Sequence, residues 1–167
     1  MTILVFSDSH GHYYNLQKTV RLHLNCGTCD AVFFLGDGVP DIKQLENDYP
    51  NLPVYYVYGN CEWTSSLSDA VYERVVELFG KRFLLMHGHK YGVKSGTDKA
   101  AMRGIELGCD CVLFGHTHTA EDTVYESPWG GTVRLINPGA LGPSPDHSYA
   151  LLNIENGHII CGFGRGD

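Results

Sequence analysis

Short apolar runs recur along the chain, and five of them end directly before polar side chains. The runs cover residues 3–7, 31–36, 54–59, 83–86 and 111–115. Bounded apolar runs of this kind are typical of buried strands. The sequence therefore predicts a sheet structure in which polar loops follow the strand ends.

Helical patterns separate the first of these runs. The apolar positions at helical spacing are Leu16, Val20 and Leu24 within residues 12–25, and Ile42 and Leu45 after Pro40, which suits a first helical turn. A third helix is predicted over Thr97–Leu107, with Gly108 as its C-cap. Alternating strands and helices favour a parallel sheet with helices packed outside it.

The second half of the chain carries a different pattern. Residues 72–78 and 82–86 flank Phe79-Gly80-Lys81 and predict a hairpin, and residues 64–70 are a polar candidate loop beside the strand ends. A run of antiparallel strands is expected over residues 122–125, 132–136, 149–154 and 158–163. These patterns predict an α/β fold in one domain, residues 1–167, with two sheets packed face to face and helices outside.

Composition narrows the function classes. The 167-residue chain is 43% apolar and carries a formal net charge of −7, without any Lys/Arg run. This charge argues against dedicated nucleic-acid binding, because a grip on phosphates needs a basic stripe. No apolar run is long enough to cross a bilayer, and no basic leader precedes the first strand. The expectation is a cytoplasmic protein; a homo-oligomer is left open.

The six cysteines give little sign of a structural metal site. Cys26-x-x-Cys29 has the spacing of half a zinc knuckle, but Cys109-x-Cys111 has the wrong spacing for the other half. We expect these cysteines to be small buried residues rather than ligands or disulfides.

The polar residues after the five runs are types that bind metals. Asp8 and His10 stand two residues apart, so in an extended segment both can reach one cation. Asp37 lies between glycines, and Asn60 offers a neutral oxygen. Each of these alone is more simply a turn or a helix cap. Two His-x-His pairs, His87/His89 and His116/His118, make a joint metal site the better interpretation.

At these residues the chain resembles the calcineurin-like metallophosphoesterases. The motifs of that superfamily are Asp-x-His, Gly-Asp, Gly-Asn-His, Gly-His and Gly-His-x-His, in this order. The corresponding segments here are Asp8-x-His10, Gly36-Asp37, Gly59-Asn60-Cys61, His87-Gly88 and Gly115-His116-Thr117-His118. Residues 137–140, Asn-Pro-Gly-Ala, resemble a late segment of the small prokaryotic phosphodiesterase branch. The resemblance implies a four-layer αββα sandwich.

The resemblance also implies two metal sites. One would use Asp8, His10, Asp37 and His118; the other would use Asp37, Asn60, His87 and His116, with Asp37 shared. Mixed carboxylate and imidazole ligands suit transition metals, manganese first, with nickel, cobalt, iron and zinc as alternatives. A metal-bridging hydroxide would attack phosphorus of a small phosphate ester.

The charge count favours a diester over a monoester. Two divalent cations bring four positive charges, and Asp8, Asp37 and one hydroxide remove three of them. The single positive charge that remains balances the one negative charge of a diester. Cys61 stands where many family members carry a histidine that protonates the leaving group, and a thiol is a poor acid for that task. His89 or solvent could supply the proton instead, so the candidate catalytic residues are Asn60, Cys61 and His89. The alternative is a non-catalytic interaction scaffold, like the retromer subunit that resembles this family.

Overall fold

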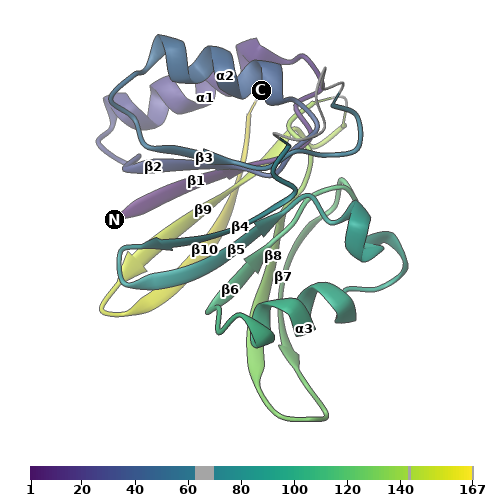
Figure 1. Cartoon of the computed structure of the whole chain (residues 1–167). Helices are drawn as coiled ribbons and strands as arrows, with labels where there is room; N and C mark the ends of the chain where they lie inside the picture. The colour runs from purple at the N-terminus through teal and green to yellow at the C-terminus, as the bar shows by residue number, and fades with distance from the viewer. Residues whose placement is uncertain (63–69, 143, 167) are drawn as a thin grey trace.

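The computed structural model describes residues 1–62, 70–142 and 144–166. Its strands form two mixed sheets of five strands each, and helices cover their outer faces (Figure 1). The layers follow the order α–β–β–α, so the predicted αββα sandwich is confirmed. Within the described part of the chain, no helix is both long and apolar enough to cross a membrane.

The first sheet has the strand order β10-β9-β1-β2-β3. Its strands are β1 (Thr2–Phe6), β2 (Ala31–Phe34), β3 (Val54–Tyr56), β9 (Ser148–Glu155) and β10 (His158–Arg165). Strands β1, β2 and β3 run parallel, and β9 pairs antiparallel with both β1 and β10. Helices α1 (Tyr13–Asn25) and α2 (Val39–Asp48) connect the parallel strands, as the alternating pattern predicted.

The second sheet has the strand order β4-β5-β6-β8-β7. Its strands are β4 (Glu73–Leu78), β5 (Lys81–Met86), β6 (Cys111–Leu113), β7 (Ala120–Glu126) and β8 (Thr132–Pro138). Helix α3 (Asp98–Glu106) lies on its outer face, after two short 3-10 helices, η2 (His89–Tyr91) and η3 (Val93–Ser95). The predicted helix at 97–107 and the hairpin between β4 and β5 are confirmed.

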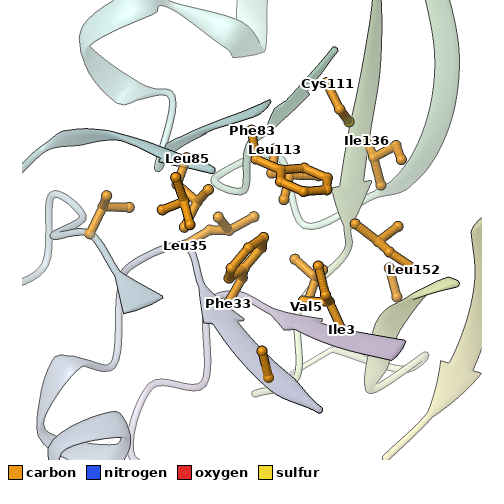
Figure 2. Packing of buried hydrophobic residues seen from close by; sticks show 14 of the residues in the cluster. Ile3, Val5, Phe33, Leu35, Phe83, Leu85, Cys111, Leu113, Ile136 and Leu152 are labelled. Atoms are coloured by element: carbon orange, nitrogen blue, oxygen red, sulfur yellow. The ribbon is translucent and has the colours of Figure 1, made fainter. Parts of the chain in front are cut away.

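Alternation along each strand builds the three apolar layers. Ile3 and Val5 of β1 face the other sheet, whereas Leu4 and Phe6 face α1 and α2. Figure 2 shows the layer between the sheets, where Phe33 and Phe83 meet edge to face with ring centroids 5.4 Å apart. Side chains of a strand point alternately to its two faces, so short apolar runs supply both layers at once.

Two sequence expectations were wrong in part. The late strands are not one antiparallel run, because β8 pairs parallel with β6, while β9 and β10 join the first sheet. Local patterns show where strands lie but not which distant strand each one pairs with. Cys26 and Cys61 are exposed rather than buried: Cys26 caps α1, and Cys61 stands in the loop after β3. The loop expected at 64–70 lies, except for residue 70, outside the described residues.

Candidate metal centre

The predicted ligands converge at the carboxyl ends of the parallel strands of both sheets. They lie on the loops that follow β1, β2, β3, β5 and β6. Three groups of side chains have ligand atoms within 4.8 Å of one another: Asp8, His10 and His118; Asp37, His87 and His116; and His10, Asp37 and Cys61. Two residues belong to two groups each: His10 links the group of Asp8 to that of Cys61, and Asp37 links the group of Cys61 to that of His87.

Asp8 is the centre of the first group. Its Oδ1 atom lies 3.1 Å from His118 Nε2 and 3.8 Å from His10 Nε2. Its other oxygen accepts hydrogen bonds from the Ser7 hydroxyl at 2.5 Å and the His116 backbone N–H at 3.1 Å. The carboxylate is fully buried, so these bonds fix which oxygen faces the two imidazoles.

His87 is the centre of the second group. Its Nδ1 atom lies 2.8 Å from the Leu35 carbonyl oxygen, which can only accept, so Nδ1 carries a proton. In the neutral ring, Nε2 then carries a lone pair. The Nε2 atom lies 3.3 Å from Asp37 Oδ2, 3.1 Å from Asn60 Oδ1 and 3.1 Å from His116 Nδ1. Acceptor atoms that face one another at these distances are suited to surround a cation.

The local electrostatics also favour positive charge at this point. Burial by itself lowers the pKa of His87, but the carboxylates of Asp37 and Asp8 outweigh it and raise that pKa. Burial tends to raise the pKa of Asp37, and the opposing contacts with His87 and the Cys61 backbone N–H hold it well below its usual range. Burial and the neighbouring His87 lower the pKa of His116 to about 4. His116 is therefore neutral near pH 7 and can bind a cation.

Left-handed backbone marks the same residues. Eight non-glycine residues of the described chain have positive φ, and five of them are predicted ligands: Asp8, His10, Asp37, His116 and His118. Such conformations are uncommon outside glycine and persist only where surrounding structure holds them. Here the Asp8 N–H donates to the Gly36 carbonyl at 2.9 Å, and the His10 N–H donates to the Asp37 carbonyl at 3.0 Å. The ligand loops hold one another in place.

Glu62 supports two ligand loops at once, and sequence reasoning missed it. Its carboxylate accepts the backbone N–H groups of Gly38 at 2.5 Å, Val39 at 3.1 Å and Asp37 at 3.2 Å, and that of Gly59. The first two of these belong to the start of α2, where the helix dipole favours an anion. Glu62 thus ties the loop of Asp37 to the loop of Asn60. The only sequence signal was a carboxylate two residues after the predicted ligand.

Asp41 and Asn137 each hold one further ligand loop. The buried Asp41 accepts the Ser9 hydroxyl at 2.5 Å and the Gly11 N–H at 3.0 Å, which fixes the loop of Asp8 and His10. Fully buried Asn137 donates to the Gly115 carbonyl at 3.0 Å and to Thr117 Oγ1 at 2.9 Å. The late motif at residues 137–140 therefore orients the His116–His118 loop.

The two other predicted site residues lie beside the ligands. The Cys61 N–H donates to Asp37 Oδ1 at 2.8 Å, and Asn60 Nδ2 donates to Cys61 Sγ at 3.2 Å. Burial and the Asp37 carboxylate raise the pKa of this thiol to about 11. The His89 ring lies 5.4 Å from the His87 ring and packs against Tyr72, and burial lowers its pKa.

Other candidates lie outside the centre. Cys26 and Cys29 belong to none of the ligand groups found among the described residues. Arg103 pairs with Glu73 at 2.8 Å, and Arg134 pairs with Asp122 at 2.7 Å. Both arginines are thus engaged by carboxylates.

Comparisons with known proteins agree with this geometry. Residues 1–157 match the family model of the calcineurin-like phosphoesterase superfamily domain. The chain is 32% identical over 160 residues to the probable metallophosphoesterase YsnB of Bacillus subtilis (strain 168), covering 93% of this chain and 86% of that protein. It is 30% identical over 152 residues to the phosphodiesterase MJ0936 of Methanocaldococcus jannaschii, with 83% of each covered.

A solved structure shows the same fold. The crystal structure of a predicted phosphoesterase from Streptococcus pneumoniae TIGR4 aligns with a TM-score of 0.78 and 23% identity, covering 99% of this chain and 89% of the other. The family match spans every ligand loop described above. The chain belongs to the calcineurin-like phosphoesterase superfamily.

Proposed function

We propose that this protein is a two-metal phosphodiesterase that hydrolyses small phosphate esters. Family membership makes a metal-dependent phosphoesterase the general class. The diester specificity, the ligand set and the identity of the metals are the parts that we infer.

The observation that carries the proposal is the position of His87 Nε2. His87 Nδ1–H donates to the Leu35 carbonyl. The other ring nitrogen, Nε2, therefore faces atoms of Asp37, Asn60 and His116. In many metal sites the second nitrogen of a ligating histidine is held by a carbonyl or carboxylate in this way. The donor set therefore suits a transition-metal cation.

The chain's residues would divide into two ligand sets with Asp37 in common. Asp8, His10 and His118 would hold one cation, and Asn60, His87 and His116 the other. When bound, such a metal pair supplies an acidified water at neutral pH and neutralises the phosphate oxygens. Glu62, Asp41 and Asn137 would keep the ligand loops in register.

Two observations favour a diester. Arg103 and Arg134, which could neutralise a second phosphate charge, are held in ion pairs. A relative with 30% identity is named a phosphodiesterase. Because Cys61 occupies the position of the usual proton donor, substrates with good leaving groups should react fastest.

A scaffold role is the second candidate. Trp129 is 82% exposed and lines a groove of about 690 Å³ beside α3 and β7, together with Tyr91, Met102, Tyr125, Pro128 and five charged residues. Exposed apolar surface of this kind is typical of binding sites. A scaffold without catalysis would keep its partner binding when its metals are removed.

Metal removal and restoration test the enzyme proposal. Chelation should abolish hydrolysis of an aryl phosphodiester, and Mn²⁺ should restore it better than Mg²⁺, because imidazole ligands favour transition metals. The panel should pair each diester with the monoester of the same leaving group. Full activity with Mg²⁺ alone would contradict the histidine ligands, and faster monoester turnover would contradict the diester specificity.

A further inference from the structure

The Cys61 thiol lies among candidate ligands although the resemblance gives it no role in metal binding. Ligand atoms of Cys61, His10 and Asp37 all lie within 4.8 Å of one another. Two hydrogen bonds hold the residue in place, one from its own N–H to Asp37 at 2.8 Å and one from Asn60 to Sγ at 3.2 Å. The side chain is exposed, so small ions can reach it from solvent.

These three residues form a ligand group that includes a thiol, whereas the other two ligand groups contain only carboxylates and imidazoles. A thiolate is a soft ligand that prefers zinc and cadmium, whereas Mn²⁺ prefers carboxylate and carbonyl oxygens. Ligands of one zinc ion lie about 2.0–2.3 Å from the metal, so they stand within about 4 Å of each other. The ligand atoms of Cys61, His10 and Asp37 lie within 4.8 Å of one another, so each pair is at most about 0.8 Å beyond this spacing.

We propose that Cys61 is a conditional ligand, which coordinates thiophilic cations together with His10 and Asp37 and thereby inhibits the centre. On binding, a sulfur–metal bond forms and the thiol proton passes to solvent. The added ligand occupies a coordination position that catalytic metal sites keep open for water or substrate. With Mn²⁺ the thiol stays unligated and that position stays open. The inhibitory consequence rests on the proposed phosphodiesterase function, whereas the coordination itself does not.

Cobalt absorption tests the coordination directly. The full chain is stripped with chelator and reloaded with Co²⁺, and its near-ultraviolet spectrum is recorded without substrate. Wild-type protein should show sulfur-to-cobalt charge-transfer absorption, which Cys61→Ser should lack. Cys26→Ser is the matched control, because Cys26 is also exposed but belongs to no ligand group found in the described chain. It should keep the absorption.

Cadmium binding gives the second measurement. Cys61→Ser should bind Cd²⁺ at least about tenfold more weakly than wild type, the lower range for losing a residue that supports a metal site. Mn²⁺ affinity should be equal in the two proteins. In the Mn²⁺-loaded enzyme, added Cd²⁺ should inhibit wild type at lower concentration than Cys61→Ser.

The outcomes separate this inference from the proposed function. Absence of the absorption in cobalt-loaded wild type, or equal Cd²⁺ affinity in both proteins, would overturn the role of Cys61, even if Mn²⁺ supports hydrolysis. Absorption that depends on Cys61 would uphold the coordination even if no phosphodiester is hydrolysed with any metal. Equal cadmium inhibition of both Mn²⁺-loaded proteins would overturn the inhibitory role.

Discussion

Left-handed backbone occurs at both ends of the sandwich, but the two ends use it differently. At one end are the hairpin turns Phe79-Gly80 and Asn156-Gly157, in which both residues of each pair have positive φ. These two-residue turns join β4 to β5 and β9 to β10. Paired left-handed residues match the twist of the strands that they connect. The strain there is local and needs no distant partner.

At the ligand end the same conformation depends on other parts of the chain. Asp8, Asp37 and His116 are left-handed in loops that donate to, or accept from, loops far away in sequence. Space is also tight: a Cβ atom added at Gly59 would stand 2.0 Å from Asp37 Oδ1. At Gly157 no atom lies within 4 Å of such a Cβ. Changes at the hairpin end should affect stability alone, and changes at the ligand end should affect metal binding.

The largest effect is expected for Asp37→Asn. The change removes one negative charge from the ligand that both proposed metal sites share, and metal binding requires ligands in their charged or lone-pair form. Hydrolysis should fall to background and Mn²⁺ affinity should drop at least about 100-fold. Metal content and circular dichroism should be measured on the same sample.

Asp110→Asn is the matched control from the hairpin end. Asp110 accepts the Arg82 N–H at 2.8 Å and Lys81 Nζ at 3.2 Å, far from the ligand loops. This variant should keep its metals and its activity. Two bound metals and normal activity in Asp37→Asn would remove Asp37 from the centre.

A smaller effect is expected for Glu62→Gln. The variant loses the charge that faces four backbone N–H groups and places an amide NH₂ against some of them. Mn²⁺ affinity should fall about 10–100-fold, as for other residues that orient ligands. Calorimetric titration with Mn²⁺ measures this, while Glu77→Gln, an exposed carboxylate paired with Arg82, should leave it unchanged. Equal affinity in Glu62→Gln and wild type would show that the clamp does not position the ligands.

The smallest effect is expected for Gly157→Ala. Its φ of 76° is unfavourable for alanine, but open space surrounds the added methyl. The free energy of unfolding should decrease by about 1 kcal/mol, with Mn²⁺ affinity unchanged. Gly59→Ala, in contrast, should weaken Mn²⁺ binding, because the added methyl collides with Asp37. Denaturant unfolding and metal titration of both variants measure the contrast; weakened metal binding in Gly157→Ala would break the division between the two ends.

Local sequence patterns were sufficient for the elements of the fold. The helices at 13–25 and 98–106 and the strands that precede each ligand lie where apolar periodicity predicted them. Those signals depend on neighbours along the chain, so they can be read without a structure. The motif order also indicated the family, and the family model confirms it.

The sequence by itself determined where strands occur along the chain and the chemical types of the residues that follow them. The tertiary structure alone decided that β8 pairs parallel with β6, that Glu62 joins two ligand loops, and that five candidate ligands adopt left-handed backbone. It also brought Cys61 beside His10, 51 positions earlier in the chain. Each of these depends on hydrogen bonds or packing between segments that are distant in sequence. Local sequence patterns carry no information about such interactions, so they could not be predicted.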